Sequence, residues 1–237
     1  DNWIKGMMEA TGGYVTTWDA VNEAISGTDA DGDGYYDLQS ASNGDPTTNF
    51  YWQDYLGNED YVRIVVAKAR QYFQEYGNKK AESLVHWIET WESDGVTKID
   101  GIGTQMHVSY ILNEADQKAQ EDAIVNMFQI LAASGKLIKI SELDMGICEK
   151  AFGTGLKTEE VTFEQQQKMA EFYTFIIRKY FEIIPVEQQY GITQWCATDS
   201  EDKENVWRRG EPVGLWDLNY NRKPTYEGFL KGLSGEE

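Results

Sequence analysis

Four short apolar segments alternate with amphipathic helices along this chain, and that alternation limits the folds open to it. The segments are Tyr14–Val21, Ile99–Val108, Leu137–Met145 and Gly191–Ala197. Each is too short for a helix and rich in residues that favour a buried strand. Strand and helix in alternation predict an α/β fold with a parallel sheet, and a closed barrel is one form of that fold.

The helices between these segments show clear boundaries. The clearest is predicted to begin at Thr162, where Gln165 completes a capping box, and to stop before Pro185. Offsets of three and four mark its inward face as Met169, Phe172, Tyr173, Ile176, Ile177, Tyr180, Phe181 and Ile184. Further helices are predicted over 58–73, 81–91 and 114–133. A last helix from Pro224 is expected to bury Tyr226, Phe229, Leu230 and Leu233.

Length and charge restrict the classes of partner. The 237 residues suit one domain, 1–237, with a core of its own. With 40 acidic against 21 basic residues, the net charge of −19 argues against nucleic acid and anionic membrane as partners. No apolar run approaches the roughly 18 residues of a membrane span. A neutral polymer and an extracellular, cell-surface or periplasmic location are compatible with this charge.

Polar side chains follow the apolar segments. Glu23 follows the first, Gln105 and His107 close the second, and Glu142 and Trp195 end the third and fourth. In a barrel the C-terminal ends of the strands meet at one rim, so these side chains are expected to converge. Two glutamates there fit glycoside hydrolysis, with one carboxyl protonating the leaving oxygen and the other attacking the anomeric carbon. The alternative for each glutamate alone is a helix-cap partner or a surface charge.

These strings, taken in order, resemble glycoside hydrolase family 10, the endo-β-1,4-xylanases, over about residues 3–233. The motifs are Trp18–Glu23, Ile99–His107, Ser141–Asp144, Gln194–Trp195 with Asp199, Trp207–Arg208, Pro212–Asp217 and Lys223–Tyr226. The resemblance implies retaining hydrolysis of xylan through a glycosyl-enzyme, with no cofactor required.

The resemblance also implies a role for individual residues. It makes Glu23 the general acid/base and Glu142 the nucleophile, with Asp144 as a supporting partner of Glu142. The substrate-binding residues that it implies are Asn22, Gln105, His107, Trp195 and Trp207. Among these, Asn22 is expected to hydrogen-bond the sugar 2-hydroxyl. Gln105 and His107 are expected to support the two glutamates, and the tryptophans to enclose the sugar at the cleaved bond.

The chain departs from the family pattern in its strand count. Strands 1–3 and 5 of a (β/α)8 TIM barrel are not evident, so the barrel is expected to be incomplete in this chain. Because open sheet edges are unfavourable, the missing N-terminal part of the same barrel is an expected partner. Two rival functions stay open, namely an inactive barrel fragment and a non-catalytic glycan-binding protein. A related β-1,4-glycan such as cellulose stays open as the substrate.

An acidic loop resembles an EF-hand loop. Its positions 1, 3, 5 and 9 are Asp29, Asp31, Asp33 and Asp37, with Gly34 at position 6 and Ser40 at position 12. The loop therefore predicts a structural calcium site, and the alternative is a solvated acidic turn.

Cys148 and Cys196 are the only cysteines of the chain. Two cysteines do not make a disulfide framework, and the simpler interpretation is two buried small apolar side chains. A bridge between them stays open, because both follow candidate strand ends.

Overall fold

The computed structural model describes residues 3–4, 7, 21–45, 47, 50–57, 60–65 and 81–235. The chain divides into two compact units, Asp1–Thr104 with Ala133–Ile138, and Gln105–Ala132 with Lys139–Glu237. The helices of the described residues include α2 (Gln53–Leu56), α4 (Ala81–Glu92), α5 (Glu114–Ala133), α6 (Phe163–Ile183) and α7 (Pro224–Ser234). The strands are β1 (Gly101–Ile111), β2 (Leu137–Cys148) and β3 (Gln189–Gln194). Two short 3-10 helices are Thr158–Glu160 and Val186–Gln188.

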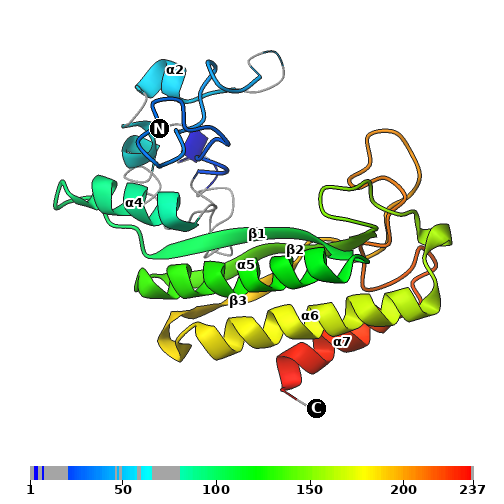
Figure 1. The fold of residues 1–237 in the computed structure, drawn as a ribbon. Helices are drawn as coiled ribbons and strands as arrows, with labels where there is room; N and C mark the ends of the chain where they lie inside the picture. The colour runs from blue at the N-terminus through cyan, green and yellow to red at the C-terminus, as the bar shows by residue number, and fades with distance from the viewer. Residues whose placement is uncertain are drawn as a thin grey trace. The chain divides into compact units, whose positions relative to one another are not determined.

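The three strands form one parallel sheet in the order β1-β2-β3 (Figure 1). This confirms the prediction of parallel strands joined by helices. Two strands are longer than predicted, because Leu112 N still donates to Cys148 O at 2.9 Å and pairing continues to the ends of β1 and β2. The strand predicted over 191–197 is displaced and ends at Gln194. Of the predicted strand over 14–21, only Val21 lies within the described residues.

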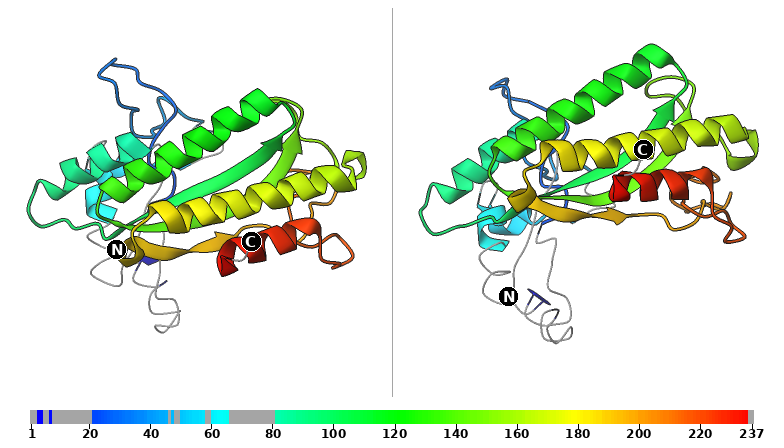
Figure 2. Two further views of the ribbon diagram at one scale, coloured as in Figure 1. Left: turned by 60° about the horizontal axis from the view of Figure 1, so that its bottom comes forward. Right: turned by 90° about the horizontal axis from the view of Figure 1, so that it is seen from below.

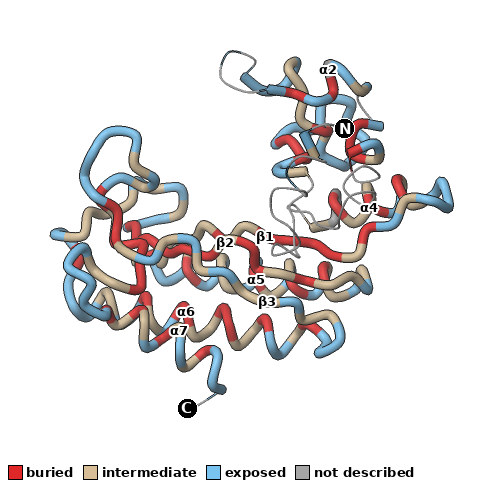
Figure 3. The backbone as a smooth tube through the Cα atoms, turned by 180° about the vertical axis from the view of Figure 1, so that it is seen from behind, coloured by how far each residue is buried: buried red, intermediate tan, exposed pale blue. Residues whose placement is uncertain are grey.

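The central strand β2 forms the middle of the core. Its alternating side chains are fully buried on both faces, at Ile138 and Ile140 on one and Leu143, Met145 and Ile147 on the other. The tube in Figure 3 is coloured as buried over parts of both β1 and β2. Burial on both faces makes β2 a rigid base for any side chain that it holds at the site.

Helices α5 and α6 lie side by side along one face of the sheet, and α7 packs against α6 (Figure 2). The predicted capping box at the start of α6 is confirmed. Thr162 Oγ1 accepts from Gln165 N at 3.2 Å, and Thr162 N donates to Gln165 Oε1 at 2.8 Å. No helix among the described residues is long and apolar enough to cross a membrane.

The buried face of α7 differs from the prediction. Leu230 and Leu233 are 52% and 47% exposed, and the residues that α7 buries are Thr225, Gly228 and Gly232. A Cβ at Gly228 would lie 2.1 Å from Ala170 O, so the two helices meet backbone to backbone at a glycine. Apolar periodicity predicted burial of Leu230 and Leu233 and did not predict the contact at Gly228. The predicted burial of Phe181 on α6 is wrong, because this side chain lies at the edge of the buried helix face and is 41% exposed.

The unit formed by Asp1–Thr104 and Ala133–Ile138 contains α4 and the described residues before it. Helix α4 confirms the prediction over 81–91. Residues 61–65 are helical with Tyr61 and Val65 buried, as predicted, whereas 66–73 lie outside the described residues. Near the end of α4, Glu92 accepts from Lys136 Nζ and from Ile99 N, both at 2.8 Å.

Candidate active site

Adjacent strands place four predicted site residues together. Gln105 and His107 are two residues apart on β1, and Glu142 and Asp144 are two residues apart on β2. Successive side chains of a strand point to opposite faces, so each pair shares a face. The four residues lie within their strands, inside the segments that the sequence predicted as strands.

Both oxygens of the Glu142 carboxylate have a partner on β1. Gln105 Nε2 donates to Oε1 at 3.0 Å, and His107 Nε2 lies 3.1 Å from Oε2. The side chain of Glu142 is 15% exposed. A carboxylate held at both oxygens has little freedom to rotate, while its exposed part can still meet a substrate.

His107 joins Glu142 to a second carboxylate. Its Nδ1 lies 2.9 Å from Asp144 Oδ2, and the side chain of Asp144 is fully buried. Burial disfavours a charged imidazole, but the hydrogen bonds and charges of Asp144 and Glu142 outweigh it and raise the pKa of His107. Burial likewise opposes ionisation of Asp144, yet His107, Trp207 and Arg208 together lower its pKa. A protonated imidazole can donate to both carboxylates at once.

Two predicted tryptophans flank this imidazole. The ring centroid of Trp207 lies 4.7 Å from that of His107, and the centroid of Trp195 lies 6.0 Å from it. The two side chains are 48% and 51% exposed. Trp207 Nε1 donates to Asp144 Oδ2 at 2.8 Å, so its ring is fixed while much of its surface stays open. Such open aromatic faces suit stacking on the apolar face of a sugar.

Sequence reasoning gave no role to Arg208, which the structure places at the same buried carboxylate. Its Nη1 lies 3.0 Å from Asp144 Oδ1. The only signal in the sequence was the position of Arg208 directly after Trp207 in a recognised motif. The residue that it binds lies 64 positions earlier, and sequence spacing gave no indication of that contact.

The two cysteines are both free, so no bridge joins them. Cys196 Sγ lies 3.9 Å from Asp144 Oδ2, and burial raises the pKa of this thiol to about 12. Cys148 is buried, as predicted, whereas Cys196 is only half-buried, so the interpretation of two buried small apolar side chains holds for Cys148 alone.

Asn22 and Glu23 belong to the other unit and line a cavity there. The cavity has a volume of about 300 Å³, and its wall also contains Gln39, Gln53 and Trp52. Glu23 has a φ of 48°, a left-handed backbone conformation that is uncommon for a residue with a side chain. Strained backbone of this kind is often found where a side chain is aimed at a functional site.

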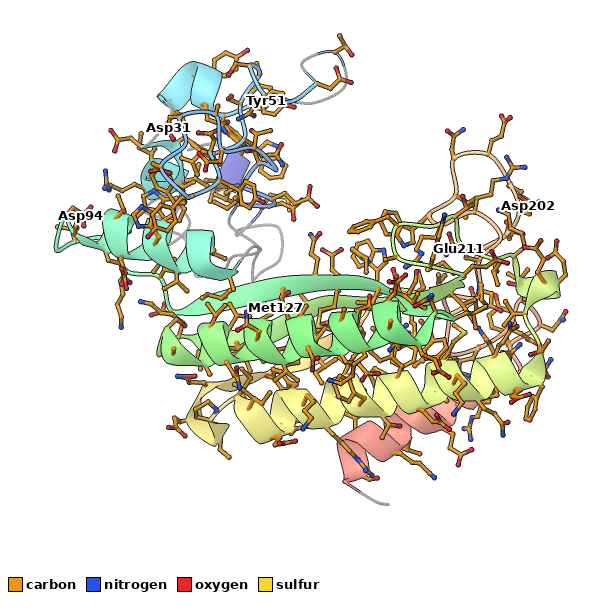
Figure 4. The ribbon with its side chains drawn as sticks, in the orientation of Figure 1. Asp31, Tyr51, Asp94, Met127, Asp202 and Glu211 are labelled. Atoms are coloured by element: carbon orange, nitrogen blue, oxygen red, sulfur yellow. The ribbon has the colours of Figure 1, made fainter. Side chains whose placement is uncertain are left out.

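The acidic loop brings three of its predicted ligands together. Carboxylate oxygens of Asp29, Asp31 and Asp33 lie within 4.8 Å of one another, and all three residues are exposed. Asp37 is not part of this group, and its Oδ2 accepts from Ala30 N at 3.0 Å. Tyr35 stacks on His86 of α4 with centroids 4.0 Å apart, which anchors the loop on that helix. Asp31 is labelled in Figure 4.

Comparison with known proteins decides the family. Residues 1–232 match the family described as glycosyl hydrolase family 10. The chain belongs to this family. Curated relatives include the endo-beta-1,4-xylanase Xyn10C of Cellvibrio japonicus, 28% identical over 252 residues. That match covers 95% of the chain and 38% of the relative, so the chain spans well under half of the relative's length.

Solved family 10 structures share the fold. A structure of GH10 from Paenibacillus barcinonensis gives a TM-score of 0.72 at 26% identity and covers 98% of this chain and 65% of that one. A mutant xylanase A of P fluorescens subsp. cellulosa in complex with xylopentaose gives 0.74 at 26% identity, covering 98% and 69%. The resemblance identified in the sequence motifs is therefore confirmed at the level of family and fold.

Proposed function

We propose that this chain carries the catalytic residues of a retaining endo-1,4-β-xylanase. The main support is Glu142, whose two oxygens lie 3.0 Å from Gln105 Nε2 and 3.1 Å from His107 Nε2. A carboxylate held in one orientation can attack an anomeric carbon and form a glycosyl-enzyme. Asp144 keeps its place in this proposal as the partner that orients His107.

Glu23 supplies the second carboxyl group of the mechanism. It first gives a proton to the leaving oxygen and then takes a proton from the water that releases the sugar. Asn22 hydrogen-bonds the sugar 2-hydroxyl. The support is that both residues line one cavity with the amide side chains of Gln39 and Gln53, which suit sugar hydroxyls.

Xylan is the substrate that fits best. Trp195 and Trp207 present exposed aromatic faces beside His107, and Gln105 supplies an amide group. The relatives are named endo-1,4-β-xylanases, and one similar structure holds xylopentaose. The acidic surface and a polymeric substrate together favour an enzyme secreted outside the cell or held at its surface.

Residues 1–237 act as one catalytic domain of a (β/α)8 barrel in this proposal. Among the described residues, β1 and β3 are the edges of a three-stranded sheet. Unpaired edges expose backbone groups, so further strands from the N-terminal part of the same barrel would complete the fold. The barrel shape of the family 10 neighbours favours this arrangement.

The reaction requires no cofactor, because two carboxyl groups supply the acid/base and the nucleophile. Calcium has a structural role only. It binds the loop through Asp29, Asp31 and Asp33, whose converging carboxylate oxygens are the ligands that this cation prefers.

The test is release of reducing sugar from xylan by the wild-type protein and by Glu142→Ala. Sugar release by the wild type and its loss in the variant are expected. Retained activity in Glu142→Ala would reject the assignment of the nucleophile. Binding of xylan without sugar release by the wild type would favour a glycan-binding protein, and faster release from cellulose would change the substrate.

A further inference from the structure

Arg208 and His107 contact different oxygens of the Asp144 carboxylate. His107 Nδ1 and Trp207 Nε1 both contact Oδ2 of Asp144, at 2.9 and 2.8 Å. Arg208 Nη1 donates to Oδ1 at 3.0 Å. Because Asp144 is fully buried, its charge depends on partners rather than on solvent. Arginine supplies a permanent positive charge for this carboxylate.

The guanidinium of Arg208 is fully committed to hydrogen bonds. Its Nη1 also donates to Val108 O at 2.7 Å, and Nη2 donates to Ser109 Oγ at 2.6 Å. Nε and Nη2 donate to Glu211 Oε2 at 3.0 and 2.8 Å. With the bond to Asp144, these contacts use all five donors that a guanidinium has. A lysine ammonium has only three donors and cannot reproduce this set.

The surrounding backbone leaves room for the Arg208–Glu211 pair. A Cβ at Gly146 would lie 2.1 Å from Arg208 Nη2, and a Cβ at Gly155 would lie 2.2 Å from Glu211 Cδ. Arg208 itself has a φ of 46°, in the left-handed region that few residues other than glycine adopt. Figure 4 labels Glu211 in the loops beyond the C-terminal ends of the strands. Backbone strain at an ion pair of this kind points to a functional constraint.

We propose that Arg208, braced by Glu211, is a positioning residue that fixes the carboxylate of Asp144 and thereby turns His107 toward Glu142. Arg208 is not expected to touch the substrate. It acts through Asp144 on the imidazole that holds one oxygen of the nucleophile. The inference rests on the proposed function, because its readout is the hydrolysis of a xyloside.

The pH dependence gives this role a distinctive signature. The charge of Arg208 is one of the causes that lower the pKa of Asp144 against the effect of burial. Without that charge, Asp144 takes up a proton at a higher pH and its bond to His107 is lost. The acidic limb of the activity profile should therefore move upward. The titratable and charged groups around Asp144 are His107, Arg208, Glu142, Glu211, Cys196 and Tyr173.

The experiment compares the wild-type protein with Arg208→Met, Arg208→Lys and Glu211→Gln on an aryl β-xyloside. We expect Arg208→Met to lower kcat by on the order of 100-fold, as misplaced catalytic groups do, with KM little changed. Arg208→Lys should not rescue it. Glu211→Gln should show a smaller loss of kcat and no upward shift of the acidic limb, because the positive charge of Arg208 beside Asp144 is kept. Arg209→Met is the matched control, because Arg209 is half exposed and pairs with the exposed Asp202.

Thermal unfolding measured beside the kinetics separates positioning from folding. A variant that unfolds at a lower temperature but keeps the wild-type kcat and acidic limb while folded would overturn the proposal. If Arg208→Met does not fold, Glu211→Gln decides, since it keeps the arginine and the shape of its partner. An inactive wild-type protein would instead reject the proposed function, which keeps the two failures distinct.

Discussion

The Nδ1 atom of His107 lies 2.9 Å from Oδ2 of Asp144, a carboxylate with no exposure to solvent. The imidazole side chain is itself only 20% exposed, so this pair is protected from solvent screening. The pKa of His107 is raised and that of Asp144 is lowered, and each partner therefore favours the charged form of the other.

These shifts predict a pH window for the contribution of the pair to stability. The raised pKa of His107 makes its contribution complete below about pH 6.5, with loss as the pH rises through the folded-state pKa. The lowered pKa of Asp144 makes its contribution present above about pH 3.9, with loss as the pH falls further. The free energy of unfolding of the wild type should exceed that of His107→Asn by about 1–3 kcal/mol between these limits.

Chemical denaturation of the two proteins from pH 3 to pH 9 checks this window. The difference between them should shrink at both ends of the range. A difference that keeps one value at every pH would show that charge at His107 contributes nothing to the stability of the fold.

The contact between Gly228 of α7 and the backbone of α6 predicts which of two substitutions in α7 destabilises the protein more. Gly228→Ala places a Cβ about 2.1 Å from Ala170 O, a backbone atom that cannot rotate away, and should destabilise by about 1–3 kcal/mol or more. Leu233→Ala removes three carbons from a side chain that is 47% exposed and should cost about 1 kcal/mol or less. Thermal unfolding of the two variants tests the order, and a larger loss for Leu233→Ala would contradict the backbone contact between α6 and α7.

The acidic loop predicts stabilisation by calcium. Added calcium should raise the unfolding temperature of the wild type, and Asp31→Asn should lose that gain because its carboxylate belongs to the converging group. Asp37→Asn is the matched control with the same change of charge in the same loop, and it should keep the gain. Equal unfolding temperatures with and without calcium in the wild-type protein would eliminate the site.

The sequence was most informative where a local rule determines geometry. The period of two along a strand places Gln105 with His107 and Glu142 with Asp144, and the capping box at Thr162 sets the start of α6. The motif order then identified the family, which residues 1–232 confirm. These features depend on neighbours in the chain and so can be recognised from sequence.

Other features depend on contacts between distant segments. Arg208 binds Ser109, which is 99 positions away in the sequence, and Asp144, which is 64 positions away. No sequence pattern near Arg208 predicts either contact. Helices α6 and α7 can approach each other closely because Gly228 has no side chain. Apolar periodicity does not predict a contact made by a glycine. Asp37 fits the spacing of a cation-binding loop, yet its carboxylate lies outside the converging group of Asp29, Asp31 and Asp33.

Trapping of the glycosyl-enzyme tests whether Glu142 is the nucleophile of a retaining mechanism. The Glu23→Ala protein is mixed with an aryl β-xyloside whose phenol leaves without protonation, and the peptides are then examined by mass spectrometry. Because the acid/base is needed to activate the water of the second step, we expect a burst of phenol and a pentosyl ester on Glu142. A burst with the ester on another residue, or with no ester on Glu142, would contradict the assignment of Glu142 as the nucleophile.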